Sequence, residues 1–151
     1  MEKIVVDASV FLSSALEGEV HSKISRKFFE TIKNSGGKIT IPVLTLFEVL
    51  HNFYRTNEDS KATQRLHEYF INLNLSGDLK ILNLEASFLA YFFTYHQHFN
   101  LKTSDAIVVL TAHREKCPLI SWDKQMLKQA SKGVAIYTPE EYLELLAGEF
   151  V

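Results

Sequence analysis

Short apolar segments alternate with longer amphipathic segments along the chain, and this alternation constrains the fold more than any other feature of the sequence. The short segments are rich in β-branched residues, which predicts strands at 4–7, 38–41, 79–84, 119–122 and 134–137. The longer segments have apolar residues at helical spacing, which predicts helices at 20–33, 43–55, 61–74, 86–99, 104–115, 124–130 and 139–146. Strands that alternate with helices predict a parallel sheet covered by helices on both faces.

Residues typical of helix ends lie between these segments. Ser60 and Thr103 are each expected to cap the helix that follows, since a hydroxyl can accept a hydrogen bond from a free backbone N–H. Pro42 and Pro139 are expected to open helices, where a missing N–H costs nothing. The sequence contains no repeat and no linker rich in Pro, Gly or Ser, so we expect a single domain over residues 1–151.

The composition is that of a globular protein with a core of its own. Hydrophobic residues make up 46% of the 151 residues, and the formal net charge is −2. A negative chain argues weakly against a nucleic-acid partner, but an acidic pocket that binds cations would leave the rest of the surface more positive. Cys117 is the single cysteine, which excludes an internal disulfide. With no leader-like or membrane-spanning apolar segment, we expect a cytoplasmic protein.

Asp7 and Asp123 share one local pattern, in which an apolar strand is followed by an acid and then by a helix. Each acid is suited to be a helix N-cap, which is a purely structural role. In a parallel sheet, however, both would project from the carboxyl edge, where ligands bind in folds of this type. The two interpretations are about equally plausible for Asp7 taken alone.

Glu48 and Asp105 belong to predicted helices that can reach the same edge. Glu48 lies on a narrow polar stripe of its helix, which is expected to have two faces. The polar face is formed by Thr45, Glu48, His51, Asn52 and Arg55. The apolar face is formed by Leu46, Phe47, Leu50 and Phe53. Asp105 lies in the first turn of a helix that is otherwise apolar on all sides. A solvated face and a favourable helix dipole are the simpler explanations of these two acids.

The four acids together predict more than each does alone. Ionised carboxylates that share a small space raise each other's pKa unless cations are present. Hard divalent cations with oxygen ligands remove this repulsion, and four carboxylates suit a pair of such ions. Two ions close together can activate a water molecule and stabilise the leaving oxygen in phosphodiester hydrolysis. The pattern therefore predicts a metal-dependent catalytic site formed by Asp7, Glu48, Asp105 and Asp123.

Four segments resemble the PIN-domain family, and within it the small VapC-like toxins: VVDASVFL at 5–12, LFEVL at 46–50, LKTSDAI at 101–107 and LISWD at 119–123. The resemblance implies a three-layer α/β/α sandwich and Mg²⁺ or Mn²⁺ as cofactor. It also implies endoribonuclease activity on structured RNA, a homodimer, and inhibition by a small antitoxin protein. Ser9 and Ser121 match positions where the family has small polar residues that support the metal ligands. Trp122 is bulkier than the family pattern leads us to expect and could alter substrate access.

Residues outside this acidic group have weaker patterns. Basic residues near it in sequence are candidates for RNA phosphates, namely Lys23, Lys27, Arg55, Lys102 and Lys124. The aromatic segment 88–99 is expected to pack both on the core and on a second subunit. The six histidines lack a zinc-binding spacing.

Two other functions fit the same fold. A non-catalytic PIN-like module would bind RNA or protein without cutting, although the presence of all four acids argues against lost activity. A Mg²⁺-dependent phosphoryl-transfer domain is the other alternative. A phosphatase of the dehalogenase type needs a second acid two residues after the first, where this chain has Ser9, and a receiver domain needs an acid adjacent to Asp7. Both requirements count against this alternative.

Overall fold

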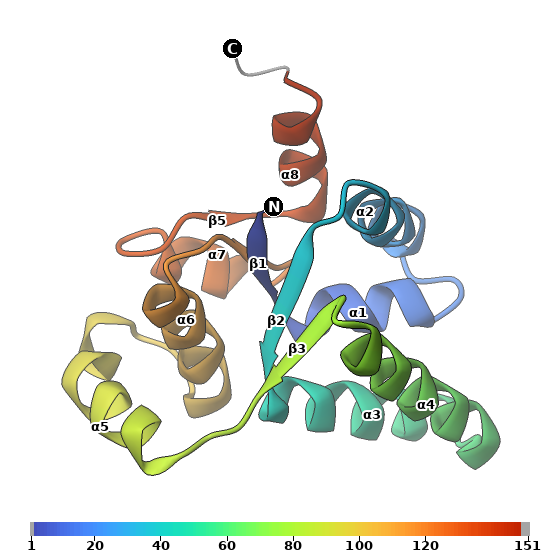
Figure 1. Cartoon of the computed structure of the whole chain (residues 1–151), viewed down its shortest axis with the longest axis horizontal. Helices are drawn as coiled ribbons and strands as arrows, with labels where there is room; N and C mark the ends of the chain where they lie inside the picture. Colours follow the sequence, from blue (N-terminus) through green and yellow to red (C-terminus); the bar gives the residue numbers. More distant parts are fainter. Residues whose placement is uncertain (1, 149–151) are drawn as a thin grey trace.

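The computed structural model describes residues 2–148 and contains a five-stranded sheet in which every pairing is parallel. The strands are β1 (Lys3–Val6), β2 (Lys38–Pro42), β3 (Leu79–Leu82), β4 (Leu119–Ile120) and β5 (Ile136–Tyr137). Their order is β3-β2-β1-β4-β5, so β1 occupies the centre (Figure 1). The predicted parallel sheet is therefore confirmed.

Helices connect the strands and cover both faces of the sheet, which confirms the three-layer α/β/α architecture (Figure 1). They are α1 (Ala8–Ala15), α2 (Ser22–Asn34), α3 (Val43–Asn57), α4 (Ser60–Ser76), α5 (Ala86–Tyr95), the 3-10 helix η1 (His96–His98), α6 (Thr103–Glu115), α7 (Lys124–Ala130) and α8 (Pro139–Leu146). Among residues 2–148, no helix combines the length and the apolar character needed to cross a bilayer.

The sheet has a separate hydrophobic core on each face because successive strand side chains point to opposite sides. Ile4 and Val6 of β1 join one core with residues of α1, α2, α3, α4 and α8. Val5 points the other way, into a core formed with α6, α7 and Phe99. β1 is thus buried on both faces, as expected for the central strand of a parallel sheet.

Several predicted boundaries were wrong by a few residues. Asp59, and not Ser60, caps α4, since its carboxylate accepts the Ala62 N–H at 3.0 Å. Thr103 is already the first residue of α6, and Lys102 occupies the N-cap without a side-chain hydrogen bond. The predicted strands at 119–122 and 134–137 each reduce to two residues, since only these pair with a neighbouring strand.

Candidate metal centre at the carboxyl edge of the sheet

The central strand β1 has β2 on one side and β4 on the other, so the connections that leave β1 and β4 diverge at the carboxyl edge. Such a switch point leaves a crevice in which ligands of parallel α/β proteins bind. Asp7 directly follows β1, and its backbone N–H donates to the Ile120 carbonyl of β4 at 2.9 Å. This bond aligns the two strand ends that carry Asp7 and Asp123.

Asp7 is buried, and its carboxylate receives three hydrogen bonds from two serines. The Ser9 hydroxyl donates to Oδ2 at 2.7 Å, the Ser121 hydroxyl donates to it at 3.0 Å, and the Ser9 backbone N–H donates at 3.3 Å. All three bonds end on the same oxygen and leave Oδ1 unused by these donors. Burial raises the pKa of Asp7, while the serine hydrogen bonds act in the opposite direction.

Asp123 caps α7 and is tied to Asp7 through Ser121. Its Oδ1 accepts the Met126 N–H at 2.9 Å, and its own backbone N–H donates to the Ser121 hydroxyl at 3.0 Å. Asp7 and Asp123 are therefore both helix caps, as the structural interpretation of the sequence anticipated. A cap needs only one carboxylate oxygen, so this role does not exclude a ligand at the other.

Glu48 and Asp105 approach the same edge from α3 and α6. Burial raises the pKa of Glu48, and the negative charges of Asp7 and Asp105 raise it further. Burial raises the pKa of Asp105 to about 6, with smaller contributions in the same direction from Asp7 and Asp123. The structure thus brings all four acids close enough for their charges to interact.

Glu48 supplies the clearest sign that this acidic group lacks a partner. Its Oε1 atom is buried and has no hydrogen-bond partner in the described chain. Leaving a buried carboxylate oxygen without a donor or a cation is costly. The group contains only oxygen donors, which is the chemistry that Mg²⁺ and Mn²⁺ prefer.

The four acids are not tightly clustered. Within residues 2–148, no three Asp, Glu, His or Cys side chains are grouped tightly enough to hold a metal ion. Lys102 at the start of α6 is the nearby positive charge that lowers the pKa of both Glu48 and Asp105.

The other predicted basic contacts lie in different places. Lys124 directly follows Asp123 and is exposed, whereas Arg55 lies in the last turn of α3, also exposed. Lys23 and Lys27 are exposed residues of α2. Lys102 alone among these five is linked to the acids by its effect on their pKa values.

The predicted faces of α3 were partly wrong. Thr45 is buried, although it was assigned to the polar face, and Phe47 is 60% exposed, although it was assigned to the apolar one. Leu46 and Phe53 are buried as expected. α3 packs against both α1 and α4, which covers Thr45 and leaves Phe47 outside.

Trp122 and His21 are residues near this edge that the sequence did not single out as a pair. Their rings stack with centroids 3.7 Å apart and an interplanar angle of 8°. Trp122 immediately precedes Asp123, and His21 precedes the first residue of α2. No spacing rule connects positions 21 and 122, so only the folded structure could reveal this contact.

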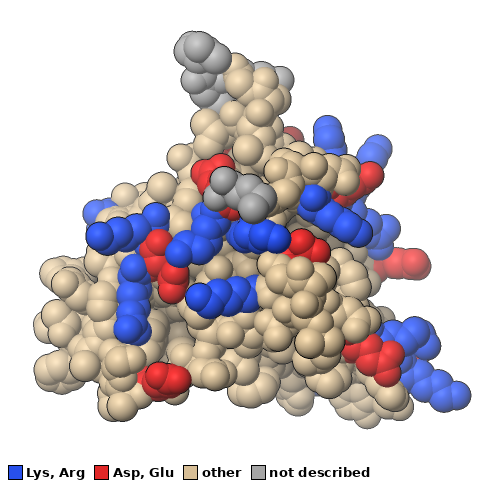
Figure 2. All heavy atoms as spheres, viewed as in Figure 1, with Lys and Arg blue, Asp and Glu red and all other residues tan. Residues whose placement is uncertain are grey.

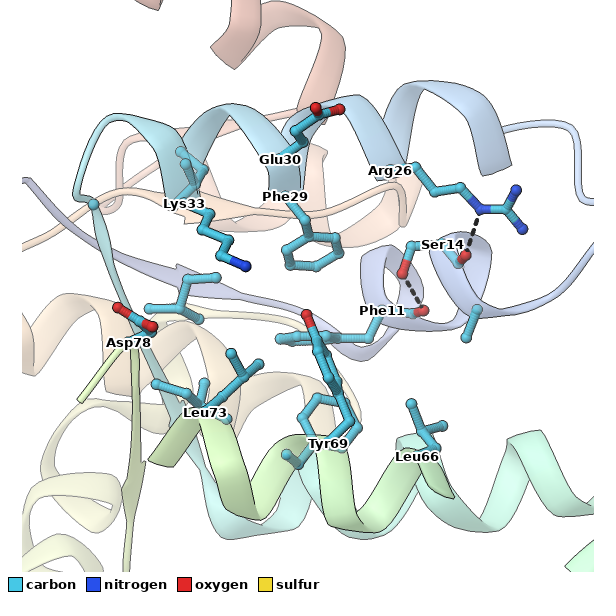
Figure 3. Close-up of a pocket in the computed structure, with 16 residues that line it drawn as sticks. Phe11, Ser14, Arg26, Phe29, Glu30, Lys33, Leu66, Tyr69, Leu73 and Asp78 are labelled. Atoms are coloured by element: carbon cyan, nitrogen blue, oxygen red, sulfur yellow. Dashed lines mark hydrogen bonds between the residues drawn. The ribbon is translucent and has the colours of Figure 1, made fainter. Parts of the chain in front are cut away.

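A groove with a volume of about 390 Å³ lies away from the acids, between α2 and α4 (Figure 3). Phe11 and Phe29 meet Tyr69 and Leu73 across it, and these apolar side chains form its floor and walls. Charged side chains surround the apolar part: Arg26, Glu30, Lys33 and Asp78 (Figure 3). None of the four acids lines this groove, so it is a second surface feature and not part of the acidic site.

The fold and the acidic edge define a small three-layer α/β/α domain with carboxylates gathered at the switch point of a parallel sheet. The family model described as "PIN domain" matches residues 4–132, and the chain therefore belongs to the PIN-domain family. No curated protein sequence matches the chain.

Several solved structures have the same fold at low sequence identity. The DNA-bound VapBC from Salmonella typhimurium is 12% identical with a TM-score of 0.68, covering 92% of this chain and 99% of that one. VapC20 from Mycobacterium tuberculosis, a toxin that cleaves the sarcin-ricin loop, is 12% identical with a TM-score of 0.64, covering 83% of this chain and 93% of that one. A toxin–antitoxin complex from Klebsiella pneumoniae is 18% identical with a TM-score of 0.63, covering 90% and 97%.

Proposed function

We propose that this chain is a divalent-metal-dependent endoribonuclease, and that Asp7, Glu48, Asp105 and Asp123 hold its Mg²⁺ or Mn²⁺. The observation that carries the proposal is the gathering of four carboxylates at one sheet edge, with the Glu48 Oε1 buried and unpartnered. Membership of the PIN-domain family and the sarcin-ricin-cleaving activity named for VapC20 support RNA as the substrate.

Each residue has a role that follows from its surroundings. Ser9 and Ser121 hold one oxygen of Asp7 and leave the other free of serine donors. Lys102 supplies a positive charge beside Glu48 and Asp105 and is suited to contact an RNA phosphate. When bound, a divalent cation supplies Lewis acidity toward the phosphodiester and lowers the pKa of a water molecule. Arg55 and Lys124 are exposed and are also suited to contact RNA phosphates.

The test is cleavage of labelled structured RNAs with Mg²⁺ or Mn²⁺, with a chelator as one control. Asp7→Asn should abolish cleavage, since a neutral amide keeps the shape but loses the ligand charge. Asp59→Asn is the matched control, because Asp59 also caps a helix but lies on α4, outside the acidic group. A chain that binds Mn²⁺ and RNA without cutting would instead support a non-catalytic PIN-like module.

We further propose that the chain is the toxin of a toxin–antitoxin pair and that a small antitoxin inserts an apolar segment into the α2–α4 groove. The apolar walls of the groove and the toxin–antitoxin complexes among structures of the same fold support this partner. RNA cleavage of this kind would take place in the cytoplasm.

If the neighbouring gene encodes a small protein, the groove can be tested by co-purification of that protein with this chain. Tyr69→Asp should release the partner, because it places a charge among apolar groove residues. Tyr54→Asp is the control, since Tyr54 has a similar exposure (45% against 54% for Tyr69) but lies outside the groove. Equal partner binding by both variants would place the antitoxin elsewhere.

We also propose a homodimer that buries α5. This helix contains no charged residue, has no buried residue, and forms an uncharged area at the lower left of Figure 2. Leu89 and Phe93 are both largely exposed on it. A second copy of the chain would remove these apolar side chains from water.

A further inference from the structure

Trp122 is held at both its backbone and its side chain, and it lies next to Asp123. Its backbone N–H donates to the Ser9 hydroxyl at 3.0 Å, and that hydroxyl donates to Asp7 at 2.7 Å. The following N–H, that of Asp123, donates in the same way to Ser121, which also donates to Asp7. The turn after β4 therefore orients both hydroxyls that hold the Asp7 carboxylate.

The Trp122 side chain belongs to a hydrogen-bonded series that includes the buried hydroxyls of Ser25 and Ser13. Its Nε1–H donates to the Ser25 hydroxyl at 2.8 Å, and Ser25 and Ser13 lie 2.7 Å apart. The Ser13 hydroxyl donates its single hydrogen to the Val10 carbonyl at 3.0 Å. Ser25 can then donate to Ser13, and its oxygen accepts from the Trp122 Nε1–H.

Ser25 is 0% exposed and Ser13 is buried, so neither hydroxyl faces bulk water as an alternative partner. These hydrogen bonds link α1, α2 and the turn after β4. Such fully satisfied buried polar networks hold their members in one arrangement.

The faces of the indole ring are also constrained. His21 stacks on the ring, and Trp122 packs against the core that contains α1 and α2 residues. Rotating the indole would therefore break its hydrogen bond, its stacking and its packing together. Because Asp123 is the next residue, a fixed Trp122 also fixes the backbone from which the Asp123 side chain leaves.

We propose that Trp122 is a positioning residue that sets the spacing between the Asp7 and Asp123 carboxylates, and that Ser25 acts through it. The inference rests on the proposed function, in which these acids bind a divalent cation. Residues that orient metal ligands commonly change metal affinity by about 10–100-fold when they are mutated. Ser25 lies on α2, which carries none of the four acids, so sequence alone gives it no role.

The experiment measures the Mn²⁺ dissociation constant of the full chain by electron paramagnetic resonance, without RNA. Two variants break the same bond from opposite sides: Ser25→Ala removes the acceptor, and Trp122→Phe removes the donor but keeps an aromatic ring. Ser35→Ala is the matched control, because Ser35 ends the same helix and its hydroxyl donates to the Ile32 carbonyl, away from the acids.

Folding is followed in each variant by circular dichroism. Trp122 is the sole tryptophan, so its fluorescence also reports the indole environment in Ser25→Ala. We expect each variant to weaken Mn²⁺ binding by about 10–100-fold. The double variant should be little worse than Trp122→Phe alone, because that variant already lacks the bond that Ser25→Ala removes. Ser35→Ala should bind as the unmodified chain does.

Normal Mn²⁺ affinity in a folded Ser25→Ala or Trp122→Phe variant would overturn the inference and leave the proposed function intact. An unmodified chain that binds no Mn²⁺ would overturn both. A loss of affinity in Ser35→Ala as large as that in Ser25→Ala would also overturn it, since the effect would then reflect general destabilisation of α2.

Discussion

Asp105→Asn should stabilise the metal-free protein at neutral pH, although it removes a proposed metal ligand. The pKa of Asp105 is about 6 in the folded chain, against an ordinary value of 3.8. The folded state therefore holds the proton more tightly than the unfolded state does. Between these two pKa values, stability falls as pH rises, because the unfolded chain ionises first.

The size of the effect follows from the difference between the two pKa values. A difference of about 2 units corresponds to an upper limit of about 3 kcal/mol at pH 7.5. Because Asp105 is only half-buried, solvent screening reduces this, and we expect about 1–2 kcal/mol. For a domain of this size, that raises the melting temperature by about 2–8 °C. Well below both pKa values the penalty is absent, and at pH 4 it is small, so the two proteins should melt nearly alike there.

The assay is thermal unfolding of the unmodified chain and Asp105→Asn in a chelator, at pH 4 and pH 7.5. A melting temperature for Asp105→Asn at or below that of the unmodified chain at pH 7.5 would refute the reasoning. Adding Mn²⁺ should raise the melting temperature of the unmodified chain, because a ligand that binds only the folded state stabilises it. The same addition should stabilise Asp105→Asn much less.

Three further predictions concern other parts of the molecule. Ser121→Ala removes a donor to Asp7 and an acceptor for the Asp123 N–H, and titration calorimetry should show Mn²⁺ binding weaker by about 10–100-fold; unchanged affinity would mean that Ser9 alone holds Asp7. Phe28→Ala empties a fully buried site and should lower the free energy of unfolding in urea by about 3–5 kcal/mol; a smaller loss would show that α2 and α8 close the cavity. Replacing both Leu89 and Phe93 with Ser should give a monomer in light scattering, and an unchanged dimer mass would exclude the α5 interface.

Local patterns were enough to predict the layers of the fold. The strand β1 and the helices α7 and α8 follow from apolar runs and from Pro139, since these signals act between residues close in sequence. Strand length depends on neighbours, so β4 is shorter than its apolar run. Asp59 and Ser60 are both suitable N-cap residues, so the sequence could not decide which of the two neighbours caps α4.

The position of the acids at one edge was predictable because parallel strands end together. Their roles as metal ligands stay a prediction. The supporting contacts were not predictable: Ser13, Ser25 and Trp122 meet only when α1, α2 and β4 pack together. Serine at positions 13 and 25 has no pattern that separates it from an ordinary surface serine. The exposure of Phe47 likewise depends on how α3 lies between α1 and α4.

The central strand has a consequence for synthesis of the chain. Asp7 is made 114 residues before Ser121, which holds its carboxylate. β1 can pair with β2 early during translation, yet its other edge stays open until β4 has left the ribosome. A growing chain therefore has no complete acidic site until residue 123 has emerged. If the chain is the nuclease that we propose, it cannot cleave RNA until most of its own synthesis is complete.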